Sequence, residues 1–310
     1  MISVVITNYN GCHILKKCLP ENIMKFKELG ITDIIVSDDC STDDSITYLK
    51  EQFSELRIAE NDQNSGFSQT CNTGAALAKE SIILFLNNDM IVKQLNVEML
   101  CKRFKDKNLF GCSPKILRYQ EKQLINETPS YGYFKGGWFS TVNSEKMLGQ
   151  VDGSKPFPIL WGCGGAFFVN KEKFNQLNGF DTLFFIGYCE DLDLSYRAWK
   201  RGWNIQYEPE GECFHHHQST MKTLFTCSFL EHIHATNHYL FMWKNLNDFS
   251  YIASHVITIL IKLITFQIKD IKAIVKALTR IRRVWSYRMT HKLFQKTDHD
   301  ILNQFQYIHS

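Results

Sequence analysis

The chain has 310 residues, of which 44% are hydrophobic and 22% are charged. This composition is typical of a globular protein and excludes a largely disordered one. The length indicates one large domain, or one domain with an appendage. A formal net charge of +3 is too small to indicate binding to nucleic acid, so we expect no such partner.

The N-terminus enters a strand-like run directly, ISVVITNYN at residues 2–10. It shows no basic segment followed by an apolar stretch and a cleavage site, so we expect no secretory signal and a cytoplasmic protein. The ten cysteines are scattered and form no C-x-x-C pair. We therefore expect no zinc cage, and predict reduced thiols that lie mostly in the core.

The first ninety residues alternate between strand and helix patterns. Strands are predicted within 2–10, 33–38, 56–62 and 82–86, and helices within 13–29, 44–53 and 64–80. This order predicts a mostly parallel, Rossmann-like sheet with helices on both faces. Ligands of such sheets bind outside the carboxyl ends of the strands. Polar residues cluster at those ends here, which is the first indication of function.

The stretch SIILFLNNDMIV, residues 81–92, holds an unbroken apolar run that is typical of a strand buried on both faces. Asn87, Asn88 and Asp89 then follow together. A strand-to-turn transition accounts for such residues. Alternatively, Asp89 supplies a hard oxygen ligand to Mg²⁺ or Mn²⁺, with help from phosphates or another side chain.

Asp38 and Asp39 stand side by side at the end of the second predicted strand. They can belong to a helix-capping cluster, which Ser41 or Asp43 alone could satisfy. They can also accept hydrogen bonds from a base or a ribose hydroxyl, provided that Thr7 and Tyr9 line the same crevice. The sequence favours neither interpretation by itself.

Two later motifs are rich in ionisable groups. CEDLDL places Glu190, Asp191 and Asp193 within four residues, either as acids at a helix N-terminus or as a general base whose pKa is raised by like charges. The segment ECFHHHQST follows a predicted strand, and alternate residues would place His215 and His217 on one side. Both histidines are candidate metal ligands beside Asp89.

Residues 119–160 are predicted to be a long irregular loop, of the kind that often forms a functional lid. After about residue 222 the pattern becomes helical. We therefore divide the chain into a catalytic domain at 1–222 and a helical extension at 223–310.

Residues 251–288 are predicted to form one amphipathic helix with an isoleucine-rich stripe. A basic side is predicted to adjoin that stripe, at Lys262, Lys269, Lys276, Arg280 and Arg283. The apolar run 251–266 is too short to span a bilayer. The helix either packs on the catalytic domain or lies on an anionic membrane surface, peripheral to the inner face of the cytoplasmic membrane.

Eight blocks in order resemble the family 2 glycosyltransferases of the GT-A fold, and most of all their bacterial polysaccharide and rhamnosyltransferase-like branch. The blocks are VVITNYNG, IIVSDDCSTDDS, NSGFSQTCNTGAALA, ILFLNNDM, GGAFFV, GFDTLFF, YCEDLDLSYRAWKRGW and the Pro-to-His segment before residue 217. The similarity covers roughly residues 1–245. It implies a GT-A nucleotide-sugar-binding domain followed by the helical extension.

The resemblance also implies a role for each matching residue. Those expected to bind the nucleotide sugar are Thr7, Tyr9, Asp38, Asp39, Asn72, Gly74, Asn87, Asn88 and Gly165. Asp191 matches the catalytic base of the E-D motif, in which Glu190 is its partner. Asp89 and His215 would hold Mn²⁺ or Mg²⁺. Asn87 replaces the first acid of the family's D-x-D motif, which bears on metal affinity.

The function implied is metal-dependent, inverting transfer of a sugar from a nucleoside-diphosphate sugar to a hydroxyl of a glycan or polyprenyl-linked glycan. A sugar nucleotidyltransferase also uses an α/β sheet and a metal-binding aspartate. It normally needs a glycine-rich, basic N-terminal loop, which TNYNGCH does not provide. A non-catalytic glycan-binding protein is the third alternative, and the joint presence of Asp89, Asp191 and His215 argues against it.

Overall fold

A computed structural model describes residues 1–120, 123–143, 151–185, 187–216, 226–291 and 294–305. The strands are β1 (Ile2–Asn8), β2 (Asp33–Asp38), β3 (Arg57–Glu60), β4 (Ile82–Asn87), β5 (Met90–Gln94), β6 (Leu109–Gln120), β7 (Gln123–Asn126), β8 (Ser130–Lys135), β9 (Trp138–Asn143), β10 (Ala166–Asn170) and β11 (Asn204–His215). The helices are α1 (Cys12–Glu28), α2 (Ser45–Gln52), α3 (Phe67–Leu77), α4 (Val97–Arg103), α5 (Lys171–Gln176), α6 (Glu190–Lys200), α8 (Cys227–Asn245), α9 (Phe249–Ile264), α10 (Ile268–Leu278), α11 (Ile281–Thr290) and α12 (Asp298–Asn303).

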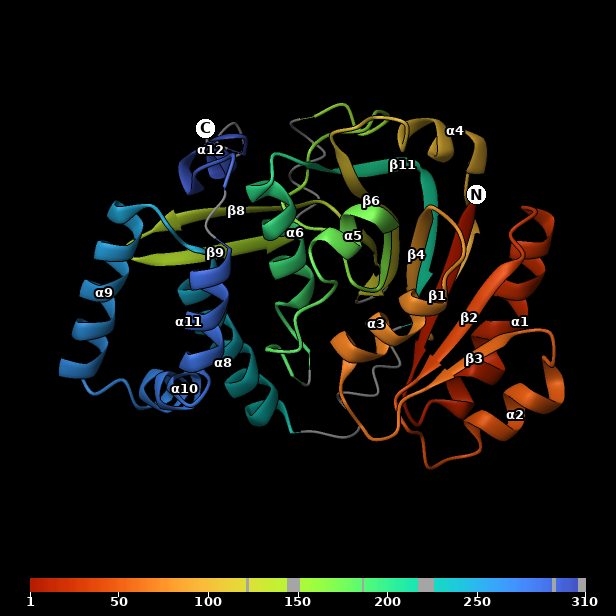
Figure 1. Cartoon of the computed structure of the whole chain (residues 1–310), viewed down its shortest axis with the longest axis horizontal. Helices are drawn as coiled ribbons and strands as arrows, with labels where there is room; N and C mark the ends of the chain where they lie inside the picture. Colours follow the sequence, from red (N-terminus) through yellow and green to blue (C-terminus); the bar gives the residue numbers. More distant parts are fainter. Residues whose placement is uncertain (121–122, 144–150, 186, 217–225, 292–293, 306–310) are drawn as a thin grey trace.

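The central sheet confirms the predicted fold class. Its strand order is β3-β2-β1-β4-β10-β6-β11-β5, and β7 pairs with β6. The part formed by β1 to β4 is entirely parallel, as the alternating strands and helices predicted. Antiparallel β10 joins this part to β6, which pairs in parallel with β11. Figure 1 shows the sheet with helices on both sides and the C-terminal helices beyond its edge.

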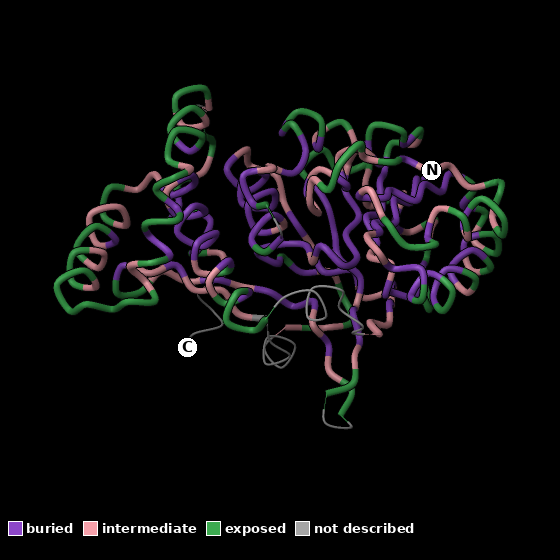
Figure 2. The backbone as a smooth tube through the Cα atoms, turned by 90° about the horizontal axis from the view of Figure 1, so that it is seen from below, coloured by how far each residue is buried: buried purple, intermediate pink, exposed green. Residues whose placement is uncertain are grey.

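The apolar run of β4 is explained by burial on both faces. Ile83 and Phe85 belong to the core cluster on one side of the sheet, and Ile82, Leu84 and Leu86 belong to the cluster on the other. Side chains of a strand point alternately to opposite faces, so both sets must be apolar. Burial is concentrated on the strands and falls toward the outer helices (Figure 2).

The prediction of an irregular loop over residues 119–160 is wrong for the described part of that stretch. β7 pairs with β6, and β8 and β9 form an antiparallel hairpin. Gly136 and Gly137 make its turn with φ values of 56° and 73°, the left-handed conformations that a two-residue hairpin requires. A Cβ on Gly137 would lie 2.0 Å from the side-chain oxygen of Thr258, so this turn also needs glycine to pack against α9.

The C-terminal helices share a core with the sheet. One hydrophobic cluster contains Phe85 and Phe167 of the sheet together with Tyr239 of α8, Ile274 of α10 and Ile301 of α12. The buried carboxylate of Asp298 accepts hydrogen bonds from α6 and from the segment before α9. The core therefore continues across residue 222, where we placed a domain boundary.

The prediction of one helix over 251–288 is also wrong, because the segment forms α9, α10 and α11. Phe266 lies between α9 and α10 with φ of 51°, which no continuing α-helix allows. The chain turns there, and Ala273, Ile274 and Ala277 of α10 are buried in the core cluster. The apolar residues of 251–288 thus serve two surfaces, one buried and one exposed.

Three of the five predicted basic residues bond to other parts of the protein, although the side chain of Arg283 stays about half exposed. Lys262 makes an ion pair of 2.6 Å with Asp270 and lies 4.3 Å from the ring centre of Trp138. Arg280 donates to the carbonyl of Leu183, and Arg283 donates to the side chain of Thr182. Within the described residues, none of the helices has the length and apolar character to cross a bilayer.

Candidate active site

The ends of β1 and β4 bring the first predicted residues together. Thr7 pairs in register with Asn87, and its hydroxyl donates to the Asn87 side-chain oxygen at 3.3 Å. The Asn88 amide donates to the side-chain oxygen of Asn8 at 2.7 Å. Tyr9 follows directly and is half-buried. These contacts create a polar edge at the carboxyl end of the parallel strands, where ligands of such sheets bind.

Asp38 and Asp39 at the end of β2 are both buried, and both carboxylates accept hydrogen bonds from the protein itself. The Asp38 carboxylate accepts from the backbone nitrogen and the hydroxyl of Ser41, each at 2.7 Å. The Asp39 carboxylate accepts from the backbone nitrogens of Ser65 and Gly66, each at 2.8 Å. The two acids organise the loops after β2 and before α3, while their contact with a nucleoside stays a prediction.

Asn72 and Gly74 position α3. The Asn72 side chain both accepts from and donates to the backbone of Phe180 at 2.9 Å. A Cβ on Gly74 would lie 2.4 Å from a methyl group of Val5, so glycine permits the close packing of α3 on β1. These structural roles account for both residue types, and a nucleoside contact is a further prediction.

Asp89 and His215 meet, as the metal prediction requires. β5 pairs with β11 so that His215 lies opposite Met90, and Nε2 of His215 is 3.2 Å from the Asp89 carboxylate. Nδ1 of His215 is 2.9 Å from the carboxylate of Glu127, which also pairs with Arg118. His217 lies outside the described residues.

The donor set fits a divalent cation. Asp89 offers a carboxylate and His215 an imidazole, a combination that suits Mn²⁺ or Mg²⁺ when phosphate oxygens complete the shell. Glu127 holds the other ring nitrogen of His215, as carboxylates commonly do for metal-binding histidines. The sequence analysis missed Glu127 because it lies in the stretch taken for a loop, far from the histidine in the chain.

Electrostatics at this centre reflect two carboxylates around one imidazole. Burial alone would lower the pKa of His215, but hydrogen bonds to Asp89 and Glu127 outweigh it and raise that pKa to about 9. Burial likewise opposes ionisation of Glu127, yet His215 and Arg118 lower the pKa of its carboxyl. A bound cation would take the place of the histidine proton between these acids.

A glycine-rich loop before β10 connects the strand ends to the second acidic motif. The backbone nitrogen of Gly164 donates to the Asp191 carboxylate at 3.1 Å, and the backbone nitrogen of Asn87 donates to the carbonyl of Gly165 at 3.0 Å. A Cβ on Gly165 would lie 2.4 Å from the side chain of Met90. Gly165 thus allows this loop, which binds Asp191 through Gly164, to pack closely against Met90.

Glu190 and Asp191 at the start of α6 are held in a poorly solvated environment. Burial raises the pKa of Asp191, while burial and the charge of Asp191 together raise the pKa of Glu190 well above its usual range. One carboxylate oxygen of Glu190 is buried and has no hydrogen-bond partner among the described residues. A raised pKa favours proton uptake at neutral pH, which a general base needs.

Asp193 has a different role from its two neighbours. It is fully buried and pairs with Arg197 one turn later at 2.7 Å. It also accepts from the Lys244 ammonium at 2.7 Å and from the Asn245 amide at 2.8 Å. Three donors surround this carboxylate, so it joins α6 to α8 and is not a candidate for the base.

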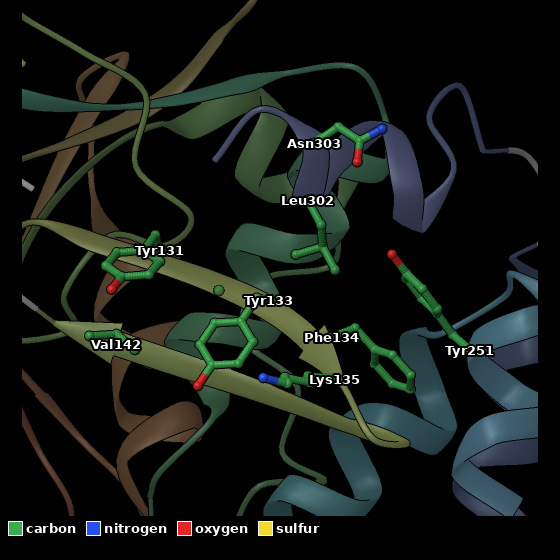
Figure 3. Close-up of a pocket in the computed structure, with 9 residues that line it drawn as sticks. Tyr131, Tyr133, Phe134, Lys135, Val142, Tyr251, Leu302 and Asn303 are labelled. Atoms are coloured by element: carbon green, nitrogen blue, oxygen red, sulfur yellow. The ribbon is translucent and has the colours of Figure 1, made fainter. Parts of the chain in front are cut away.

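A cavity of about 580 Å³ lies over the β8–β9 hairpin. It is lined by Tyr131, Tyr133, Phe134, Lys135, Tyr251 and Leu302, among others. Figure 3 shows the hairpin side chains on one side and Leu302 of α12 reaching toward them. β8, which lines this cavity, begins at Ser130, and the Ser130 hydroxyl donates to the carbonyl of Trp161 at 2.8 Å, just before the glycine-rich loop.

The chain is similar in sequence to known glycosyltransferases. Residues 3–175 match the family described as Glycosyl transferase family 2. The chain is 27% identical to Rhamnosyltransferase WbbL of Escherichia coli K12 over 186 residues, which cover 56% of this chain and 70% of that protein. It also matches polypeptide N-acetylgalactosaminyltransferases, of which it spans between 30% and 38%.

Two solved structures share the fold. GalNAc-T7 with UDP, GalNAc and Mn²⁺ superposes with a TM-score of 0.62 at 19% identity, over 79% of this chain and 48% of that chain. The mannosyltransferase PcManGT from Pyrobaculum calidifontis, in complex with GDP-Man and Mn²⁺, gives a TM-score of 0.53 at 13% identity. That superposition covers 99% of this chain and 84% of the mannosyltransferase, and so includes the C-terminal helices.

Proposed function

Because the chain belongs to glycosyltransferase family 2 and transfers a sugar from a nucleotide sugar, we propose that the transfer inverts the anomeric centre with Asp191 as base. The observation that carries this proposal is the position of Asp191. The glycine-rich loop that binds its carboxylate also binds Asn87 at the end of β4. Base and donor site would then face each other across that loop.

The proposed reaction is one displacement. The oxygen of the acceptor hydroxyl forms a bond to the anomeric carbon as the bond from that carbon to the nucleoside diphosphate breaks. The Asp191 carboxylate takes the proton of the hydroxyl, and the leaving group departs on the opposite face of the sugar. No covalent enzyme intermediate is needed, so a single carboxylate at this position suffices.

We propose Asp89 and His215 as the residues that hold a divalent metal ion, with Glu127 orienting the imidazole. When bound, such an ion supplies Lewis-acid stabilisation of the charge that develops on a diphosphate leaving group. Thr7, Asn87 and Asn88 lie at the same strand ends and can hydrogen-bond the nucleotide.

For the acceptor, we propose that a glycan or polyprenyl-linked glycan approaches along the β8–β9 hairpin. The cavity there offers the aromatic rings of Tyr131, Tyr133 and Tyr251 together with Lys135. Flat aromatic faces stack on the apolar faces of sugars. β8 starts beside the segment that leads into the loop binding Asp191, so a glycan that follows the hairpin would lead toward the base.

Incubation with a panel of nucleotide sugars should yield nucleoside diphosphate for at least one donor when Mn²⁺ or Mg²⁺ is present. A chelator should stop this turnover, and added metal should restore it. Asp89→Ala should weaken nucleoside-diphosphate binding in the presence of metal and change it little in its absence, because the carboxylate acts through the ion. Calorimetric titration with the nucleoside diphosphate measures its affinity in the presence and in the absence of Mn²⁺.

The matched control is Asp106→Ala, which removes an exposed carboxylate at the other end of the sheet and should bind like the unaltered protein. Melting temperatures of both variants identify any loss of folding. Full turnover in excess chelator would rule out the metal. Release of pyrophosphate from a sugar phosphate and a nucleoside triphosphate would instead indicate a nucleotidyltransferase.

We also propose that the exposed face of α9 and α10 docks on an anionic bilayer, which would bring the enzyme to a lipid-linked acceptor. Ile264 and Phe266 at the end of α9 are 74% and 79% exposed, and Ile257, Leu260 and Ile268 are more than half exposed. Lys272 and Lys276 are exposed on α10. The exposed apolar side chains could insert into the acyl-chain region of a bilayer, and the lysines could contact its anionic headgroups. In Figure 1, α9 and α10 lie at the end of the molecule opposite α2.

Binding to anionic vesicles should exceed binding to neutral ones and should fall as salt rises, because each lysine near the surface contributes about 1 kcal/mol that salt screens. Ile264→Gln combined with Phe266→Ser should reduce binding. Met24→Gln, at a 60% exposed apolar residue of α1, is the control and should leave it unchanged. Equal sedimentation of both variants with vesicles at low salt would contradict the docking surface.

A further inference from the structure

Outside the proposed active centre, one thiol and two imidazoles meet between α6 and α8. Cys189 directly precedes α6, and His234 and His238 stand one turn apart on one face of α8. The ligand atoms of these three side chains all lie within 4.8 Å of one another. We propose that this cluster is a second metal site, selective for a soft divalent transition metal of the Zn²⁺ class, and that the bound ion clamps the Cys189 segment to α8.

The tautomer of His238 suits a metal ligand. Its Nε2 lies 2.5 Å from the backbone carbonyl oxygen of Phe139. A carbonyl can only accept, so Nε2 carries the proton and Nδ1 keeps its lone pair. Metal-binding histidines typically donate their second nitrogen to a carbonyl or carboxylate in this way. His238 is buried, and this hydrogen bond fixes the direction in which Nδ1 points.

The backbone before α6 holds the thiol in place. Tyr188 and Cys189 both have left-handed φ values, 67° and 73°, which are costly for residues other than glycine and persist when surrounding contacts impose them. The Asn237 amide of α8 supplies such contacts by donating to the carbonyls of Gly187 at 2.8 Å and Tyr188 at 3.1 Å. The Tyr188 ring packs edge-on against His234 at 5.7 Å. The cysteine is thereby presented to α8.

The donor set decides the class of ion. One thiolate with two imidazoles is a zinc-type set, whereas Mg²⁺ and Mn²⁺ prefer oxygen ligands. Bonds of about 2.0–2.3 Å place tetrahedral ligand atoms roughly 3.3–3.8 Å apart, so small side-chain rotations would close the cluster. Binding replaces the thiol proton, which leaves to solvent. Three protein ligands leave one position for water, on the side where His234 is exposed.

The consequence concerns the proposed base. Cys189 stands two residues before Asp191, and Asp191 lies in the first turn of α6. An ion that ties Cys189 to α8 would hold the start of α6 in place without touching substrate. This role rests on the proposed function of Asp191, but the metal site itself does not. The absence of C-x-x-C pairs concealed it, because its ligands come from segments 45 residues apart in the chain.

Titration with Co²⁺ after chelator treatment tests the site, because a cobalt–thiolate bond gives a near-ultraviolet charge-transfer band that oxygen ligands do not give. We expect this band, and its loss on adding Zn²⁺, in the unaltered protein. Cys189→Ser should abolish the band, and His234→Ala should weaken binding by about 10-fold or more. Controls are Cys227→Ser, at the exposed cysteine, and His232→Ala on the same helix. Asp89→Ala should retain the band.

Zn²⁺ should also raise the melting temperature of the unaltered protein more than that of His234→Ala, since an ion that binds the folded state stabilises it. No thiolate band in the unaltered protein, or an undiminished band in Cys189→Ser, would overturn the assignment. Should Cys189→Ser not fold, equal Co²⁺ affinity in His234→Ala and the unaltered protein would overturn it. These readouts need no sugar transfer, so they stand or fall separately from the proposed activity.

Discussion

Asp191→Asn is expected to lower kcat by about 10²–10⁴-fold and to leave donor binding nearly unchanged. That range is the usual loss when a general base is removed. The amide is similar in shape to the carboxylate, which accepts from the backbone nitrogens of Gly164 and Leu192, so the loop should stay close to its position. Steady-state rates and calorimetric titration of the nucleoside diphosphate measure the two quantities independently.

The pH profile of kcat supplies a second test of this base. Burial raises the pKa of Asp191, and only the deprotonated carboxylate can accept a proton. Activity should therefore fall as the pH drops through this raised pKa, and the residual activity of Asp191→Asn should lack that limb. Activity within a few fold of the unaltered protein would transfer the role to Glu190, since Asp193 is enclosed by its own ion pairs.

The parallel half of the fold was predictable because its signals are local. The apolar run of β4, the polar residues after β1 and β2, and the alternating helices each lie within a short window of sequence. Parallel pairing places the ends of these strands at one edge, where polar residues were predicted to cluster and where Thr7 lies opposite Asn87. The meeting of Asp89 and His215 was predicted differently, from the ligands that a metal ion needs and from the family resemblance, since β5 and β11 pair in antiparallel orientation.

The remaining features depend on partners far away in the chain. Glu127 lies 88 residues before the histidine that it orients, and nothing near it marks that role. Lys262 looks like part of a solvated basic side in the sequence, yet its ammonium pairs with Asp270 under Trp138. The Gly136–Gly137 turn was a local hairpin signal that we passed over. The roles of Glu127 and Lys262 depend on tertiary contacts, which the periodicity of the sequence does not reveal.

Asp193→Ala is expected to destabilise the fold by about 3–5 kcal/mol, the usual cost of removing one partner from a buried ion pair. The change would leave Arg197 and Lys244 buried with less compensating charge, because both pair with this carboxylate. Lys244 keeps Asp181 at 2.7 Å, which should prevent complete unfolding. Urea unfolding near pH 7 measures the loss, and Asp44→Ala, at an exposed acid with no capping hydrogen bond, should change stability by less than about 0.5 kcal/mol.

The pH dependence of the Asp193→Ala variant separates charge burial from lost packing. Burial already lowers the pKa of Lys244 despite its acidic neighbours, and removing Asp193 should lower it further. A lysine with a lower pKa in the folded state binds fewer protons there than in the unfolded chain, so stability rises with pH up to the unfolded pKa of about 10.4. The difference in the free energy of unfolding between the variant and the unaltered protein should therefore shrink between about pH 7 and pH 10.

If this difference stays constant over the range, lost packing and not the buried ammonium of Lys244 causes the destabilisation. If the difference in unfolding free energy shrinks and Asp191→Asn also loses most of its kcat, two acids of one four-residue motif serve separate purposes. Asp191 then serves catalysis, and Asp193 serves folding.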